Sequence, residues 1–368
     1  MKALLALPFM VRLVLAIGLS ALISFCATPA VKRMAYKVGA IDVPKDNRRM
    51  HKIPIPRLGG LAIALAFILT TLLSVELDLQ MQGIMLGSIV ILVLGVLDDS
   101  LTLKAGPKFI VQIIAAVIVV AHGCTIRFIT NPFASEPGSY IDFGIFAAPL
   151  TILWIVMLTN AVNFIDGLDG LAVGVSGISA AMMSVIALLV AEDNVALIMA
   201  ALLGACLGFV PYNKNPAKIF MGDTGSTFLG FVLAAMSVQG MFKLYAMISF
   251  VVPFLILGIP IFDICFAVLR RLAKHQNPMV ADREHIHHRL IDMGFSQKQT
   301  VAITYTLTGV LGLAAVLLTG SGEVKTVILI CAGVVVAALA VLVIFGPAHR
   351  PAPATEQKNT EKEDGKDE

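Results

Sequence analysis

Apolar and polar residues alternate along this chain in long blocks. A helix needs roughly 17–25 apolar residues to cross a bilayer, and eleven stretches approach that length. They are residues 8–30, 57–75, 82–97, 107–122, 146–163, 170–190, 195–211, 223–241, 247–269, 301–319 and 326–346. The pattern predicts an all-α polytopic integral membrane protein with about eleven transmembrane helices.

Basic residues are distributed unevenly between these predicted spans. Most of the 27 Lys and Arg residues lie in or beside segments 31–56, 98–106, 164–169, 212–222, 270–300 and the C-terminal tail. Because loops rich in Lys and Arg face the cytoplasm, we expect the N-terminus outside and the C-terminus inside. Lys and Arg directly after the first apolar run favour a retained helix over a cleaved signal peptide.

Two stretches depart from the helical pattern. Residues 123–145 alternate around Thr125–Ile129 and Tyr140–Phe143, with Pro and Gly between them, and predict a small β-hairpin on the outer face. Residues 347–368 are rich in Pro, Glu and Lys without apolar periodicity, so we expect a disordered cytoplasmic tail. Residues 1–346 would then form one transmembrane domain.

Composition agrees with a membrane protein. The 368 residues are 58% hydrophobic and 14% charged, whereas a soluble domain carries about 25% charged residues. The five cysteines are scattered and form no CxxC pair, so the sequence indicates neither a disulfide framework nor a cysteine metal site.

Four polar residues stand at three-residue spacing between two apolar runs: Asn160, Asn163, Asp166 and Asp169. Helix capping would account for any one of them. Acids this near a bilayer are costly unless they face water, protein or a cation. Their concentration therefore favours a site, and a hard divalent cation carrying phosphate would supply the positive charge.

Two further acidic motifs fall on the same predicted inner face. Asp98 and Asp99 end the third span, where the helix dipole disfavours anions. A cation, either Mg²⁺ or an Arg or Lys side chain, should compensate them. Asp223 begins the eighth span, where the dipole favours an acid, and helix capping is part of its expected role.

The predicted inner loop 31–56 is basic and rich in proline. The loop and Arg57, which directly follows it, carry five cationic or histidine side chains: Arg48, Arg49, His51, Lys52 and Arg57. A positive-inside loop explains most of these charges. The prolines suggest a fixed shape, and a shaped basic loop beside carboxylates suits an anionic ligand such as phosphate. Lys52 and Arg57 are therefore candidate substrate-binding residues.

The inner loop 270–300 contains three histidines and an arginine close together: His285, His287, His288 and Arg289. A zinc site would need a further ligand at suitable spacing, which is not apparent nearby. Imidazole and guanidinium groups pair well with a diphosphate, so these four are candidate substrate-binding residues. Asp263, within the ninth span, would either pair with Arg270 or Arg271 or act as a ligand.

Taken in order, these motifs resemble one known family. The matching pieces are Arg48–Gly60, Asp98–Asp99, Asn160–Leu171, Phe220–Ser226 and His285–His288. Their content and order are similar to those of the polyprenyl-phosphate N-acetylhexosamine-1-phosphate transferases. Relatives often carry a third acid three residues after the Asp pair, where this chain has Thr102, so an essential third carboxylate is not expected there.

The resemblance implies transfer of a sugar 1-phosphate from a UDP-sugar to undecaprenyl phosphate, with release of UMP. It also implies Mg²⁺ or Mn²⁺ at the cytoplasmic face of the plasma (inner) membrane. The His-Ile-His-His form looks like the branch that uses UDP-N-acetylglucosamine to start teichoic acid or surface polysaccharide synthesis in cell-wall biogenesis. The alternative is the branch that uses UDP-N-acetylmuramoyl-pentapeptide in peptidoglycan synthesis.

Two other classes of protein remain open on the sequence. A secondary transporter would bind its substrate near the bilayer midplane in repeated halves, whereas these acids lie at helix ends on one face. A scaffold for other envelope enzymes would not need the acids. The expected partners are the UDP-sugar, the lipid and the membrane, with no nucleic acid; a homodimer is left open.

We expect the following roles. Asp98, Asp99 and Asp223 are the catalytic residues, with Asp98 or Asp99 orienting or deprotonating the lipid phosphate. The metal ligands are Asp223, Asp99 and Asn163. The substrate-binding residues are Lys52, Arg57, Asn160, Asn163, Asp166, Asp169, His285, His287, His288 and Arg289. A rival scheme makes an Asp the nucleophile through a phospho-enzyme.

Overall fold

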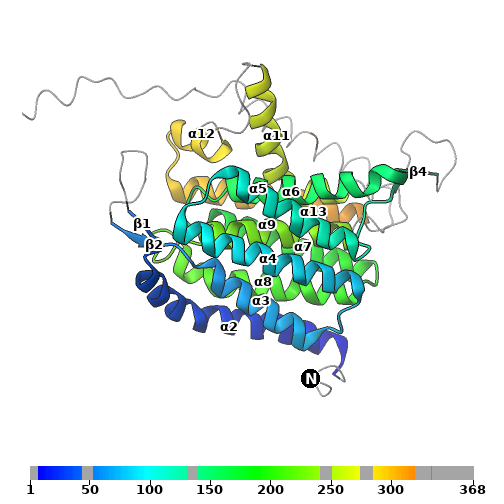
Figure 1. Cartoon of the computed structure of the whole chain (residues 1–368), viewed down its shortest axis with the longest axis horizontal. Coiled ribbons are helices and arrows are strands. Elements are labelled where there is room, and N and C mark those ends of the chain that lie inside the picture. The colour runs from blue at the N-terminus through cyan, green and yellow to red at the C-terminus, as the bar shows by residue number, and fades with distance from the viewer. Residues whose placement is uncertain are drawn as a thin grey trace, which may run out of the picture.

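The computed structural model of the chain describes residues 7–43, 53–130, 139–240, 251–273, 285–319 and 333. These residues are mostly helical (Figure 1). Six helices are long and apolar enough to cross a membrane: α2 (Phe9–Val38), α4 (Leu79–Leu101), α6 (Ala147–Phe164, after the short 3-10 helix Gly144–Phe146), α7 (Leu171–Leu189), α8 (Asp193–Asn213) and α13 (Gln297–Thr319). The protein is a multi-pass membrane protein.

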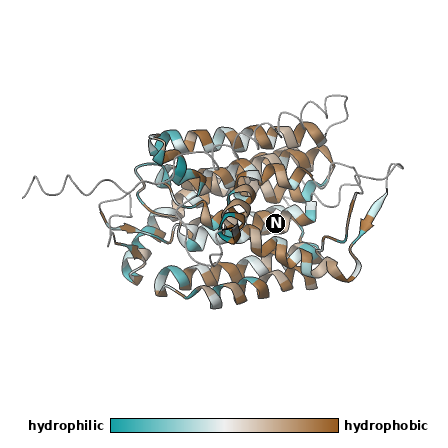
Figure 2. Cartoon of the chain, turned by 90° about the horizontal axis from the view of Figure 1, so that it is seen from above, coloured by the Kyte–Doolittle hydropathy of each residue, from teal (hydrophilic) through white to brown (hydrophobic). Residues whose placement is uncertain are grey.

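Three further helices complete the bundle: α3 (Gly60–Ser74), α5 (Ala105–Ala121) and α9 (Gly222–Gly240). Hydrophobic residues predominate along the helices (Figure 2). Where its residues are described, each predicted span up to 301–319 falls mainly on helical structure. The span 326–346 and the tail 347–368 lie outside the described residues, apart from residue 333. The count of eleven spans and the orientation of the termini therefore stay predictions.

The ninth predicted span is not one continuous helix. It is divided into α10 (Val251–Ile256) and α11 (Gly258–Ala273). Pro260 explains the interruption, because it has no N–H to donate and its ring crowds the carbonyl of Ile256. As a result α11 leaves the bundle at a steep angle to the other helices (Figures 1 and 2).

The predicted hairpin is present. Strands β3 (Phe128–Thr130) and β4 (Tyr140–Asp142) pair antiparallel, with Ile129 opposite Ile141. The structure adds a second pair that the sequence did not predict, β1 (Ile41–Asp42) with β2 (Ile55–Pro56). Strands of two residues are too short to show an alternating pattern.

The second strand pair brings the start of α3 to the start of α9. Phe220 N donates to Pro56 O at 2.8 Å, and Gly59 N donates to Phe220 O at 3.0 Å. Through these hydrogen bonds, Arg57 and Phe220 form an isolated parallel β-bridge. The basic loop and the Asp223 motif are thereby joined through backbone hydrogen bonds.

Helix α9 lies in the middle of the bundle (Figure 1) and is buried at every position from Thr224 to Gly240. Helices α4 and α6 pack along it, with α3 and α7 completing its surroundings. Glycines allow the close crossings: Gly95 of α4 lies against the backbone of Thr224, and Gly230 lies against that of Thr159 in α6. Small residues at such crossings let helices in a membrane gain van der Waals contact.

We predict that Gly230→Ala destabilises the protein by about 1–3 kcal/mol, the usual cost of overpacking a well-packed interior. The added Cβ would lie 2.8 Å from the Cα of Thr159, and backbone cannot easily yield there. Thermal unfolding in detergent measures the change. Gly18→Ala in α2 is the matched control, because its Cβ would meet nothing within 4 Å. Equal melting temperatures for the two variants would contradict the prediction.

Candidate active site

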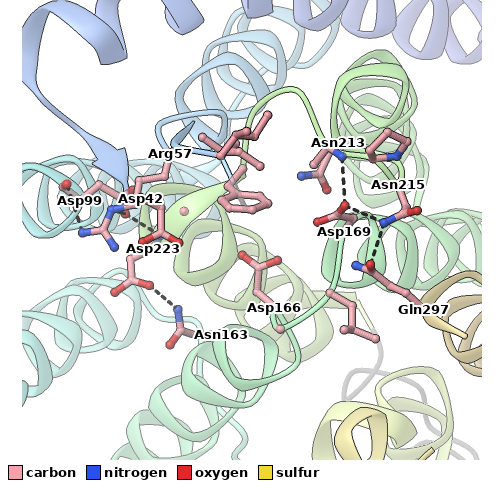
Figure 3. Close-up of a pocket in the computed structure, with 18 of the residues that line it drawn as sticks. Asp42, Arg57, Asp99, Asn163, Asp166, Asp169, Asn213, Asn215, Asp223 and Gln297 are labelled. Carbon is pink, nitrogen blue, oxygen red and sulfur yellow. Dashed lines mark hydrogen bonds and ion pairs between the residues drawn. The ribbon is translucent and has the colours of Figure 1, made fainter. Parts of the chain in front are cut away.

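One pocket of about 500 Å³ collects the polar motifs of the sequence. It lies where α4 and α6 end and α9 begins (Figure 3). Its polar lining residues are Asp42, Arg57, Asp99, Asn163, Asp166, Asp169, Asn213, Asn215, Asp223, His288 and Gln297. Of the acids that the sequence placed on one face, Asp99, Asp166, Asp169 and Asp223 line this one cavity, whereas Asp98 does not.

Asp99 holds the N-terminus of α9. One carboxylate oxygen, Oδ1, accepts from Asp223 N at 3.1 Å. The other, Oδ2, accepts from Thr224 N at 2.9 Å and from Thr224 Oγ1 at 2.6 Å. Its side chain is only 1% exposed, and Arg57 Nε lies 3.6 Å from Oδ1. The cap of α9 is thus Asp99, supplied from another helix, rather than Asp223 as the sequence suggested.

Gly222 makes this cap possible. It has a φ of 72°, in the left-handed region that favours glycine. A Cβ there would also collide with the Asp99 carboxylate. The Gly-Asp-Thr order at the start of α9 therefore fits a helix whose cap comes from outside its own sequence.

Lys108 joins two of the acids. Its Nζ forms an ion pair with Asp98 and another with Asp223 Oδ2 at 2.9 Å. Asp98 is buried and also accepts from Leu103 N at 2.8 Å. The expectation that a cation compensates the adjacent acids is confirmed, since Lys108 pairs with Asp98 and Arg57 lies beside Asp99.

Asp223 is fixed from its other side by Asn163. Asn163 Nδ2 donates to Asp223 Oδ1 at 3.0 Å and to Ser226 Oγ at 2.7 Å (Figure 3). Each carboxylate oxygen of Asp223 therefore has its own partner, one from α5 and one from α6. The Asp223 side chain nevertheless remains 35% exposed and accessible from the pocket.

Asp166 stands in the pocket between two groups of side chains, the acids beside Arg57 and the amides near Asp169 (Figure 3). Burial raises its pKa to about 8, and the charges of Asp223, Asp99 and Asp169 add to this effect. No described residue donates a hydrogen bond to its carboxylate. Asp166 therefore keeps its proton to a higher pH than an ordinary carboxyl group does.

The turn that carries Asp166 and Asp169 is held from α8 and α13. Asp169 Oδ2 accepts from Asn215 Nδ2 and from Ala217 N, both at 3.0 Å. Gly170, with a φ of 81°, donates its N–H to Asn213 Oδ1 at 3.1 Å. Its carbonyl accepts from Tyr305 Oη at 2.5 Å. Asn215 Nδ2 also donates to Gln297 Oε1 at 2.7 Å.

The histidine loop forms the short helix α12 (Ile286–Asp292). Asp263 accepts from Ile286 N at 2.9 Å, and its other oxygen lies 2.7 Å from His285 Nδ1. Asp263 therefore pairs with His285, and not with Arg270 or Arg271 as one interpretation of the sequence had it. His288 lines the pocket.

The other two members of that loop are buried. His287 packs against Gly167, and burial together with its histidine neighbours lowers its pKa to about 3. It is therefore neutral at physiological pH. Arg289 is 7% exposed and does not line the pocket.

Five predicted site residues in the described part of the chain are not among those that line the pocket: Asp98, Asn160, His285, His287 and Arg289. Asn160 lies one turn before Asn163 and pairs with Gln112 of α5. Lys52 lies outside the described residues, as do Arg48, Arg49 and His51. The predicted metal role of Asp99 gains no support from its geometry, because both its oxygens already accept hydrogen bonds.

The sequence did not single out five polar residues that take part in the site: Asp42, Lys108, Asn213, Asn215 and Gln297. Lys108 carried a signal, since it is a charge in the first turn of an apolar span. Asn213 and Asn215 lie between an apolar run and a proline, a pattern that is also typical of an ordinary helix end and therefore does not mark a site. Asp42 and Gln297 have no sequence pattern that marks them.

The pocket brings acids and cations together at the ends of membrane helices, an arrangement that suits ligands carrying phosphate groups. Residues 81–241 match glycosyl transferase family 4. The chain belongs to this family, since its similarity to curated relatives extends over most of its length.

Three relatives illustrate the range of that similarity. The probable undecaprenyl-phosphate N-acetylglucosaminyl 1-phosphate transferase of Bacillus subtilis is 41% identical over 310 residues, 84% of this chain and 86% of the relative. The decaprenyl-phosphate N-acetylglucosaminephosphotransferase of Mycobacterium tuberculosis is 32% identical over 356 residues, covering 89% and 88%. The phospho-N-acetylmuramoyl-pentapeptide-transferase of Halalkalibacterium halodurans is 28% identical over 312 residues, covering 81% and 93%.

We predict that Asp166→Asn raises the melting temperature of the protein in EDTA. The folded-state pKa of Asp166 lies above its usual value of 3.8, so ionisation costs stability increasingly as pH rises from that value towards about 8. The gain should be larger at about pH 9 than at about pH 5. Asp169→Asn is the matched control, because its carboxylate accepts hydrogen bonds, and it should give no gain. A gain that does not depend on pH would contradict the assignment.

Proposed function

We propose that this protein transfers N-acetylglucosamine 1-phosphate from UDP-N-acetylglucosamine to undecaprenyl phosphate and releases UMP. The transfer would be the first membrane step in synthesis of a cell-wall polymer, such as teichoic acid or a surface polysaccharide. The names of the Bacillus subtilis and Mycobacterium tuberculosis relatives, which describe N-acetylglucosamine phosphate transfer to a polyprenyl phosphate, support this substrate pair.

The observation that carries the proposal is the arrangement around Asp223. Two cationic side chains, Arg57 and Lys108, lie beside two carboxylates, Asp99 and Asp223, at one end of an apolar bundle. A water-soluble UDP-sugar and the head of a membrane lipid can meet only at such a boundary. Both are anions, so positive charge and fixed hydrogen-bond donors are what their approach requires.

The chemistry we propose is direct displacement. An oxygen of the lipid phosphate forms a bond to the β-phosphorus of the UDP-sugar. The bond from that phosphorus to the oxygen shared with the α-phosphate breaks, and UMP leaves with that oxygen. A phosphate monoester has a second pKa near 6, so it is largely dianionic at neutral pH and needs little help from a base.

Individual residues take their roles from their contacts. Lys108 is positioned between Asp98 and Asp223 to bind a phosphate oxygen when either acid releases it. Arg57 offers a second positive charge at the pocket wall. Asp98 forms an ion pair with Lys108 and thereby positions the Lys108 ammonium group for the lipid phosphate. Asp169 and Asn215 offer hydrogen-bonding groups to the nucleotide, and His288 offers an imidazole to the diphosphate or sugar. Both amide atoms of Asn213 are instead engaged within the protein, by Gly170 N and Ile219 O.

The residues present fit a divalent cation such as Mg²⁺ or Mn²⁺. Asp166 lacks a donor, and Asp223 remains open to the pocket. Among the described residues, no three His, Cys, Asp or Glu side chains are grouped closely enough to hold an ion by themselves. Mg²⁺ usually binds through one or two carboxylates plus substrate phosphates. Asp223 and Asp166, with Asn163 nearby, would hold the ion, which would neutralise charge on the reacting phosphates.

The positive-inside distribution of Lys and Arg supports a site on the cytoplasmic face of the plasma membrane. The side chains that form the pocket belong to the segments that this rule places inside, and the β3–β4 hairpin lies beyond the opposite ends of α5 and α6. UDP-sugars are made in the cytoplasm, so this orientation also suits the proposed donor.

We predict that purified protein with undecaprenyl phosphate and Mg²⁺ releases UMP from UDP-N-acetylglucosamine, and not from UDP-N-acetylmuramoyl-pentapeptide. Release from the second donor alone would assign the protein to peptidoglycan synthesis. Silence with both donors, in folded protein, would contradict the proposal.

We predict that Asp223→Asn lowers the turnover number by about 100-fold or more, as expected when a preorganised charge is removed from a transfer site. Melting temperature and expression show that the variant is folded. Near-normal turnover would contradict the role of Asp223. Exchange of labelled UMP into the UDP-sugar without lipid would favour the phospho-enzyme scheme over direct displacement.

A further inference from the structure

A pair of amides joins α5 to α6 outside the pocket. Asn160 Nδ2 donates to Gln112 Oε1 at 2.6 Å, and Gln112 Nε2 lies 3.5 Å from Asn160 Oδ1. Gln112 is only 3% exposed. Asn160 Nδ2 also donates to Val156 O at 2.8 Å. The donor of Asn160 is therefore engaged within the protein, which does not suit the substrate-binding role that the sequence predicted.

The pair lies one helical turn away from the two residues that grip Asp223. Lys108 precedes Gln112 by four positions on α5, and Asn163 follows Asn160 by three positions on α6. Residues at these spacings share one helix face. Lys108 holds one oxygen of Asp223 and Asn163 holds the other. The amide pair and the Asp223 carboxylate therefore form two successive cross-links between α5 and α6.

Physical constraints make the amide pair an effective cross-link. Breaking it would leave the buried amide of Gln112 without its partner, at a cost of about 1–3 kcal/mol, whereas Asn160 would keep its bond to Val156 O. A shift of α5 along α6 would break the pair and, in the same movement, change the distance between Lys108 and Asn163.

We propose that Gln112 and Asn160 are positioning residues for the transfer reaction. They fix the spacing of α5 and α6 so that Lys108 and Asn163 hold the two oxygens of Asp223 in place. The expected effect on turnover rests on the proposed function. The expected restraint of Lys108 does not depend on which UDP-sugar the protein uses. A displacement of about 1 Å at a reacting group can cost up to about 100-fold in rate.

The test uses a double-mutant cycle with a rescue. Gln112→Ala, Asn160→Ala and the double variant are compared with the exchanged pair Gln112→Asn with Asn160→Gln, which keeps the total length and both amides. We expect each single variant to lose at least about tenfold in kcat, with KM for UDP-N-acetylglucosamine changed less than about twofold. The double variant should lose no more than the worse single variant, and the exchanged pair should recover most of the loss.

The control is Gln239→Ala, which removes a buried amide near the opposite end of α9. Its Oε1 has no hydrogen-bond partner among the described residues, and Gln239 does not line the pocket. It should keep wild-type kcat. Independent losses in the double variant, or an exchanged pair that stays as slow as the single variants while its melting temperature is wild-type, would overturn the proposal.

A second measurement does not depend on turnover. Lys108 is restrained by Asp98 and Asp223, so Gln112→Ala and Asn160→Ala should speed its modification by an amine-reactive reagent, followed by mass spectrometry of the peptide. The exchanged pair should restore the slow rate. An unchanged rate in both single variants would overturn the inference even if wild-type protein used no UDP-N-acetylglucosamine. Faster labelling in an enzyme silent with every donor would instead overturn only the proposed function.

Discussion

The bond between Asp99 and the first turn of α9 is the interaction on which the rest of the site depends. A helix buried on every side must still satisfy the free N–H groups at its N-terminus. Here a carboxylate from the end of α4 does so, and it accepts from Asp223 and Thr224 at once. The same hydrogen bonds fix the position of Asp223 in the first turn of α9 and the position of α9 along α4. They also hold the Asp99 carboxylate where Arg57 lies beside it.

The cap also explains how so many acids share one pocket near a bilayer. Asp99 is stabilised by backbone N–H groups and Arg57, and Asp98 by Lys108. Asp166 alone has neither a donor nor a cation among the described residues. Asp98 and Asp99 are thus paired with cations of the protein itself, whereas Asp166 can be paired only with a group that enters the pocket. Such a site suits ligands that carry phosphate groups, and the relatives are named as transferases of N-acetylglucosamine phosphate.

Much of this arrangement could be predicted from the sequence, because hydrophobic length and the spacing of acids are local signals. The helices, the β3–β4 hairpin and a cation beside Asp98 followed from them. The cap did not, because the partners of Asp99 are backbone groups 124 positions or more away. The pairing of Gln112 with Asn160 could not be predicted either, because a single amide in an apolar run does not indicate which residue it will bind. The division of the ninth span was signalled by Pro260, although hydropathy alone gave one continuous helix.

The most direct measurement is the melting temperature of Asp99→Asn and Asp98→Asn with EDTA and with Mg²⁺. An Asn at position 99 can offer only one oxygen to the three donors that Asp99 satisfies. A cap role predicts that Asp99→Asn melts well below wild type already in EDTA, while any stabilisation by Mg²⁺ is retained. A variant that melts like wild type in EDTA and loses only its response to Mg²⁺ would contradict the cap and make Asp99 a metal ligand.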